Sequence, residues 1–170
     1  MLMPSKVCRS ATLLVLAISA ALPLAAVLRP AGNAHANQEK AAEPWTQGQE
    51  LHPAELVREL GAAKGENAPT IVYVGFRTLF AGGHIPNATF HGTASDVNGL
   101  ANLKKWIAAL PRSTNLVIYC GCCPFDHCPN IRPAFKALHE MGFKHLRVLV
   151  LPTSFAADWV EKGYPIQKGL

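Results

Sequence analysis

The sequence predicts an α/β protein with a central, mainly parallel sheet that is covered by helices on both faces. Three runs rich in β-branched and apolar residues, 70–74, 115–120 and 146–151, suit buried strands of a parallel sheet. Helical patterns alternate with these runs, and the connections are short, which favours right-handed crossovers. We therefore expect the three runs to be neighbours in one sheet.

The expected helices are bounded by residues that favour helix ends. Each carries an apolar stripe at helical spacing that could pack on a sheet. The expected helices run from Pro53 to Gly61, from Asp96 or Asn98 to Pro111, from Asn130 to Gly142, and from Thr153 or Ser154 to Gly163.

The chain has 170 residues, which is enough for one domain with a core and too few for two. Residues 37–50 are small and polar, and they predict a flexible leader. No internal repeat or linker interrupts the rest. We expect one domain over residues 51–170.

Residues 1–36 have the three parts of a secretory signal peptide. A positively charged start is followed by an apolar run over residues 11–28 and then by Ala34-His35-Ala36, where cleavage is expected. The alternative, an uncleaved anchor helix, is disfavoured because Pro23 interrupts the run. We expect an exported, periplasmic or secreted protein with no membrane contact after cleavage. No basic tract remains in the rest of the chain, so no nucleic-acid partner is expected.

Four cysteines follow the predicted signal peptide, and all lie within one short segment. They are Cys120, Cys122, Cys123 and Cys128. Disulfides among them would close only tiny loops, which remove little entropy from the unfolded chain. The cluster therefore favours thiol chemistry or metal binding over structural cross-linking.

Cys120 ends a predicted strand, and a predicted helix begins about ten residues later. Ligands of parallel α/β proteins gather at this edge, where helix N-termini offer free N–H groups. The loop could curl into a cradle of N–H donors that favours a nucleophilic thiolate at Cys120. Arg77 and Arg132 could face the loop and attract an anion. A buried structural cysteine is the simpler interpretation of Cys120 alone, and the three neighbouring thiols weigh against it.

Five segments occur in a characteristic order: Val74-Gly75-Phe76-Arg77, Gly83-His84-Ile85-Pro86-Asn87-Ala88, Val117-Ile118-Tyr119-Cys120, the helix and turn from Phe135 to Phe143, and Trp159 to Pro165. Together they resemble the rhodanese (sulfurtransferase) family over about residues 51–167. The resemblance implies a rhodanese-like fold and a persulfide formed on Cys120. The sulfur would come from a thiosulfate-like donor and pass to a thiophilic acceptor, with no cofactor and no metal.

The resemblance also implies that the loop itself binds the substrate. This role would fall to Gly121, Cys122, Cys123 and Cys128, together with Arg77 and Arg132. The expected substrate is a small sulfur-containing anion or thiol, and the acceptor could be a protein.

Two departures from the family pattern concern the site. Gly75 stands where the family usually has an aspartate, and the cysteine loop is about five residues longer than expected. Three alternatives therefore remain: a thiol–disulfide redox module using Cys120 and Cys123, a metal-binding module in which His127 joins the thiolates, and an inactive domain that binds a partner.

Overall fold

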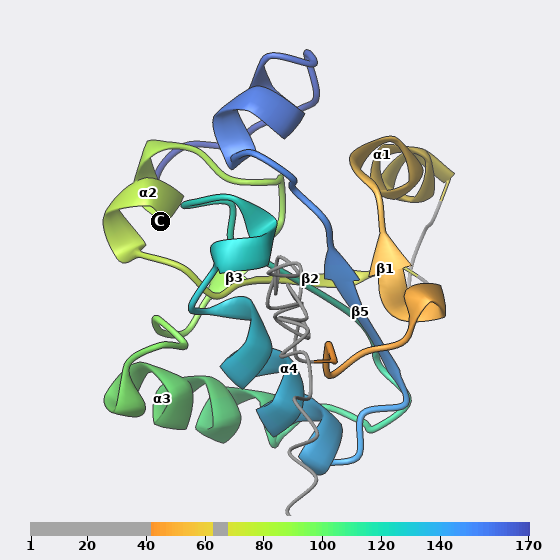
Figure 1. The fold of residues 1–170 in the computed structure, drawn as a ribbon, viewed down its shortest axis with the longest axis vertical. Coiled ribbons are helices and arrows are strands. Elements are labelled where there is room, and N and C mark those ends of the chain that lie inside the picture. The colour runs from red at the N-terminus through yellow and green to blue at the C-terminus, as the bar shows by residue number, and fades with distance from the viewer. Residues whose placement is uncertain (1–41, 63–67) are drawn as a thin grey trace, which may run out of the picture. The chain divides into compact units, whose positions relative to one another are not determined.

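The structure is a computed structural model that describes residues 42–62 and 68–170 (Figure 1). The predicted signal peptide and the first residues of the predicted leader lie outside the described residues. Within the described part, no helix has the length and apolar character needed to cross a membrane.

In the described part of the chain, five strands form one parallel sheet in the order β1-β5-β4-β2-β3. The strands are β1 (Glu50–Leu51), β2 (Thr70–Tyr73), β3 (Thr89–Phe90), β4 (Asn115–Tyr119) and β5 (His145–Leu149). β4 lies at the centre and pairs with both β2 and β5, so the predicted neighbourhood of the three long strands is confirmed. Each long strand ends one or two residues before its predicted end, because the chain leaves the sheet there for the loops of the carboxyl edge.

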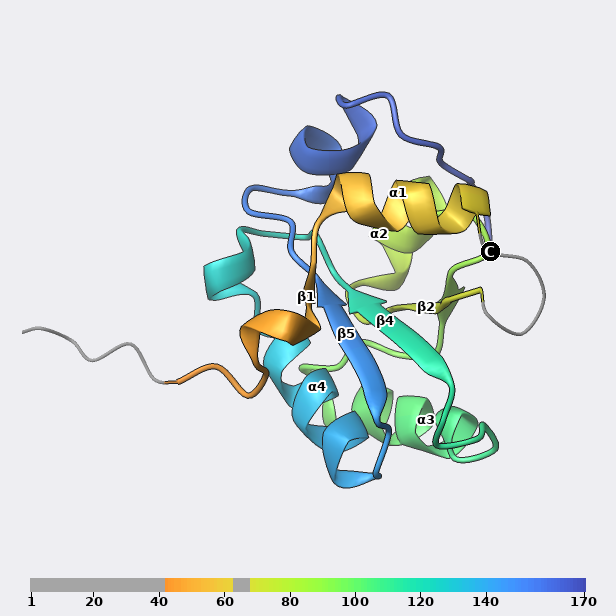
Figure 2. The same cartoon turned by 90° about the vertical axis from the view of Figure 1, so that its right-hand side faces the viewer.

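Helices cover both faces of the sheet, as predicted (Figure 2). The helical elements are α1 (Pro53–Ala62), α2 (Arg77–Gly82), α3 (Val97–Ile107), α4 (Ile131–Glu140), the 3-10 turns η1 (Gln47–Gln49) and η3 (Phe125–His127), and the π-helical turn η4 (Ala156–Val160). α3 and α4 lie on one face, and α1, α2 and η4 lie on the other (Figure 2).

Alternating side chains of the central strands supply two cores, one on each face of the sheet. Leu116 and Ile118 of β4 pack with the α3 and α4 side, whereas Val117 and Tyr119 pack with the α1 and η4 side. All four are fully buried. The near-continuous apolar sequence of β4 follows from this burial on both faces.

The predicted helix boundaries hold best where a side chain or a glycine sets them. Asp96 caps α3, since its carboxylate accepts a hydrogen bond of 2.8 Å from the backbone N–H of Gly99. Gly142 follows α4 with a φ of 85°, which suits a glycine. The last predicted helix is shorter than expected: η4 begins at Ala156, after a turn in which Asp158 accepts from the backbone N–H groups of Thr153 and Ser154.

The prediction of a flexible leader is wrong for residues 42–50. Trp45 is only 7% exposed and packs against the rings of Phe125 and Phe135. Residues 47–49 form η1, and Glu50 begins β1, which pairs with β5 at the sheet edge. One large aromatic side chain buries enough apolar area to hold an otherwise polar segment on the core. The folded domain therefore begins before residue 51.

Candidate active site

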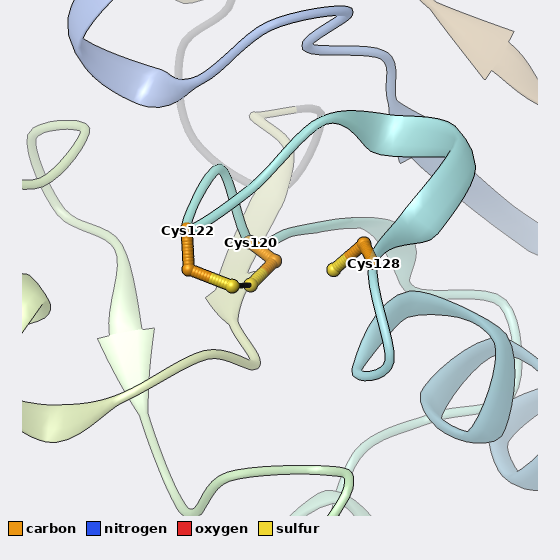
Figure 3. A group of neighbouring side chains, drawn as sticks. All are labelled: Cys120, Cys122 and Cys128. Carbon is orange, nitrogen blue, oxygen red and sulfur yellow. Dashed lines mark hydrogen bonds between the residues drawn. The ribbon is translucent and has the colours of Figure 1, made fainter.

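Cys120 directly follows β4 at the carboxyl edge of the sheet and is 1% exposed. The chain then loops through η3 and returns, so that Cys122 and Cys128 point toward Cys120 (Figure 3). The Sγ atoms of these three residues all lie within 4.8 Å of one another. The Cys120 thiol donates to Cys122 Sγ at 3.1 Å. Three of the four predicted loop cysteines thus form one cluster.

The N-terminus of α4 acts on Cys128 rather than on Cys120. A hydrogen bond from the Cys120 thiol, and then the backbone N–H groups of Asn130 and Ile131, lower the pKa of Cys128 to about 5. Burial opposes this shift. Backbone N–H groups at a helix start favour a thiolate. The sequence analysis predicted these N–H donors around Cys120. The length of the loop before the helix did not show which cysteine would lie at the helix N-terminus.

Cys120 keeps its proton next to this thiolate. Its hydrogen bond with Cys128, followed by burial, raises the pKa of the Cys120 thiol far above the ordinary range. The titration of these two thiols therefore belongs to the pair and not to either residue alone. Cys123 is not part of the group of three thiols. Burial, and then its contact with Cys122, raise the pKa of Cys123 to about 12.

Asn130 organises the cluster and was missed as a functional residue. It occupies the N-cap position of α4, as predicted, but its side chain makes no capping hydrogen bond. Instead the fully buried amide donates to the sulfurs of Cys120 and Cys122, at 3.5 and 3.7 Å, and accepts from the backbone N–H of Ser95 at 3.0 Å. The position of Asn130, an expected helix cap directly after the cysteine loop, could have indicated that its side chain contacts the thiols.

Gly75 explains why the aspartate of the family pattern is absent. A Cβ on residue 75 would lie 2.7 Å from Cys120 Sγ and 2.5 Å from the hydroxyl of Tyr73, so a side chain there would have to displace both groups. Gly121 is constrained as well: its φ is 73°, and a Cβ there would lie 2.7 Å from the Cβ of Phe155. These glycines let the two loops close around the thiol.

A cavity of about 490 Å³ opens beside Cys120, Gly121 and Cys122. Its wall is mainly apolar, with one cationic side chain, and includes Tyr73, Leu79, Phe155, Val160, Ile166 and Lys168. The hydroxyl of Tyr73 is buried and makes no hydrogen bond of standard geometry within the described residues. A molecule in this cavity would contact Cys120 and Cys122, and Lys168 would be the charged side chain beside it.

The two predicted arginines lie outside this cavity. Arg77 is exposed and lines a different hollow, with Phe80 and His91. Arg132 is held by Glu43 at 2.6 Å and by the carbonyl oxygens of Phe125 and Cys128, both at 3.3 Å. Its guanidinium therefore braces the cysteine loop instead of facing the thiols.

The sulfur cluster could also hold a soft metal ion. Thiolates select Cu(I) and Zn²⁺, and Cys120, Cys122 and Cys128 are close enough to share one ion. Within the described residues, this three-thiol group includes neither His127 nor Cys123, contrary to the ligand set of the metal alternative.

Comparison with known proteins defines the fold class. No family model matches the chain, and no curated protein is similar to it. The rhodanese-like domain of the Alr3790 protein from Anabaena sp. matches with a TM-score of 0.52 and 21% identity, covering 71% of this chain and 79% of that chain. The BH2092 protein from Bacillus halodurans matches with a TM-score of 0.54 and 17% identity, covering 70% of this chain and 76% of that chain.

The architecture is thus a parallel α/β sheet with a thiol cluster at its carboxyl edge. It is the rhodanese-like fold, as the sequence predicted.

Proposed function

We propose that this protein is a sulfurtransferase that carries a sulfane sulfur as a persulfide on Cys120. The observation that carries the proposal is the position of Cys120, which directly follows the central strand, lines a cavity and lies within 4.8 Å of a second thiol. A rhodanese-like fold alone would not define an activity, since one fold hosts many functions.

The thiol pair supplies both a nucleophile and a base. As Cys120 attacks the sulfane sulfur, its proton passes to the Cys128 thiolate. A new S–S bond forms on Cys120, and the bond between donor and sulfane sulfur breaks, with its electron pair leaving on the donor remainder. An acceptor nucleophile then takes the outer sulfur, and the electron pair of the S–S bond returns to Cys120.

The cavity favours a donor with an apolar body and a single negative charge. Lys168 is the cation on its wall, and Arg77 and Arg132 are directed elsewhere. A doubly charged anion such as thiosulfate would lose more hydration than one lysine restores. An organic thiosulfonate or a thiol-bound persulfide would instead bury its carbon skeleton against Leu79 and Val160. A cysteine of a protein acceptor could reach the same cavity.

Mass spectrometry of sulfur loading tests the proposal. Reduced Cys128→Ser protein treated with benzenethiosulfonate should gain about 32 Da, and cyanide should remove the added sulfur. The Cys120→Ser,Cys128→Ser double variant should gain nothing, because a hydroxyl cannot form a persulfide. Loading that survives the loss of Cys120 would refute its assignment as the sulfur carrier.

Metal binding is a second candidate function, favoured by the three sulfurs within 4.8 Å of one another. A metal protein would purify with one equivalent of metal, and its thiols would react only after chelation. Metal-free protein that loads sulfur, with thiols that react at once, would exclude this candidate.

We also propose that the protein acts outside the cytoplasm. The basic start, apolar run and Ala34-His35-Ala36 site support cleavage after Ala36. The mature chain should begin near Asn37, as intact-mass analysis of the exported fraction would reveal. Full-length protein retained in the membrane would contradict this proposal.

A further inference from the structure

The cysteine loop contains more thiols than sulfur transfer needs. One persulfide-forming cysteine suffices to pass a sulfur from donor to acceptor. Here a second thiol, Cys128, lies at the far end of the loop and points back at the first (Figure 3). Its sulfur lies within 4.8 Å of Cys120 Sγ.

We infer that Cys128 resolves the persulfide on Cys120, so that this protein also reduces sulfane sulfur and releases it as hydrosulfide. The inference rests on the proposed function, because a persulfide must form before it can be resolved. It adds an activity, reduction, to sulfur transfer.

The distance between the two sulfurs permits this step. A disulfide needs an S–S separation of about 2.05 Å, so the sulfurs must approach by no more than about 3 Å. Both ends of the loop are held in place, so only a small movement is needed: Arg132 binds the carbonyl oxygen of Cys128, and Asn130 donates to Cys120 Sγ. Side-chain rotation can supply part of the approach without unfolding the loop.

The electrons and atoms balance within the pair. Cys128 sulfur attacks Cys120 Sγ, and a Cys120–Cys128 disulfide forms. The bond to the outer sulfur breaks, and its electron pair leaves with that sulfur, which takes the proton from Cys128 and departs as HS⁻. The sulfane sulfur gains two electrons, and the two cysteines lose two. An external dithiol reductant would reset the pair for another turnover.

The neighbouring cysteines are less suited to this role. Cys122 is two residues from Cys120, so a disulfide between them would close a very small, strained ring. Cys123 lies outside the group of three sulfurs within 4.8 Å of one another and contacts Cys122 instead, at 3.5 Å. Cys128 alone among the three combines separation from Cys120 along the chain with a sulfur close to Cys120 Sγ.

A single-turnover experiment tests the inference. Fully reduced, metal-free wild-type protein is mixed with benzenethiosulfonate, which contains no thiol, and free sulfide and protein mass are followed together. We expect about one equivalent of sulfide per chain and a protein about 2 Da lighter than its reduced form. Peptide mapping should then join the peptides of Cys120 and Cys128. A persistent gain of 32 Da without sulfide would overturn the inference and leave the proposed function intact.

Two variants separate the inference from the proposed function. Cys128→Ser should gain the 32 Da more slowly, because the base of the loading step is removed, and should then hold it without releasing sulfide. Cys122→Ser is the matched comparison: its loading rate changes as well, since Cys122 lines the cavity, but the sulfur that it loads should still be released as sulfide. Release that is lost in Cys122→Ser but kept in Cys128→Ser would overturn the assignment of Cys128. Neither added mass nor sulfide in any of the three proteins would overturn the proposed function itself. If Cys128→Ser failed to fold, the wild-type peptide map would still decide.

Discussion

The two ends of the sheet differ in how their polar groups are paired. At the amino end, Arg147 donates to both carboxylate oxygens of Glu59, at 2.7 Å each, and to the side-chain oxygen of Asn115 at 3.0 Å. The cavity there is larger, at about 770 Å³, yet two of the charged groups that line it, Arg147 and Glu59, already bind one another. At the carboxyl end, Cys120 and Cys128 titrate as a pair, and the buried hydroxyl of Tyr73 makes no hydrogen bond of standard geometry within the described residues. The candidate active site is therefore distinguished by the reactive thiols at the carboxyl end, rather than by the size of its cavity.

The largest effect should come from filling the space beneath the thiol. Gly75→Asp would push a side chain into Cys120 Sγ and the hydroxyl of Tyr73, and we expect sulfur loading to slow by about 100-fold, as for other small misplacements of reacting groups. Stopped-flow or quenched mass analysis would measure the rate. Gly61→Ala is the control, because within the described residues no atom beyond the adjoining backbone of α1 lies within 4 Å of its added Cβ. Normal loading by Gly75→Asp would show that the carboxyl end is less tightly built than described.

The pH dependence of loading should distinguish the thiol pair from an isolated cysteine. Because the pKa of Cys128 lies at about 5, the pair keeps its negative charge down to that pH. The loading rate should be nearly constant from pH 8 to pH 6 and fall about tenfold from pH 6 to pH 4. A rate that already declines below pH 8 would indicate an ordinary thiol and contradict the lowered pKa of Cys128.

Tyr73→Phe should separate stability from activity at the carboxyl end. Removing a buried hydroxyl that makes no hydrogen bond of standard geometry within the described residues should raise the free energy of unfolding by about 1 kcal/mol. The same change should slow loading by about fivefold, since the hydroxyl can donate to a substrate in the cavity. Urea denaturation and loading kinetics measure the two effects. Equal loading rates in Tyr73→Phe and wild type would assign the hydroxyl no part in the reaction.

The smallest effect should come from the amino end and should concern stability alone. Arg147→Met should lower the free energy of unfolding by about 1 kcal/mol at pH 7, because the ion pair is partly exposed, and it should leave loading unchanged. Arg147 lowers the pKa of Glu59 below 4.5, so the pair stabilises the fold above that pH and loses this contribution as acid protonates Glu59. Arg147→Met should therefore show a weaker acid dependence than the exposed control Lys144→Met. A slower loading rate in Arg147→Met would break the distinction between the two ends.

The sequence predicted those parts of the fold that local patterns determine. The apolar runs of β2, β4 and β5 and the glycine after α4 depend on periodicity and on one backbone conformation, both visible in the chain. β1 and β3, of two residues each, were missed because so few residues carry no period. Trp45 was missed for a different reason: its partners, Phe125 and Phe135, are distant in sequence.

The site was predicted to the level of the loop but not of its individual atoms. Cys120 was located by the strand that it follows. The contacts of Arg132 with Glu43 and of Asn130 with the thiols depend on how a longer loop closes, which no local pattern encodes. The same closure brought Cys128, rather than Cys120, to the N-terminus of α4.

The brace between Glu43 and Arg132 also makes the cysteine loop mechanically sensitive. Arg132 holds the loop through the carbonyl oxygen of Cys128, and Trp45 packs beside it, with its ring tilted against that of Phe125. Tension on the chain ahead of Glu43 would therefore reach the thiol pair before it reached the sheet. A support or fusion partner attached at that end would pull on the spacing between the two sulfurs on which both proposed reactions depend.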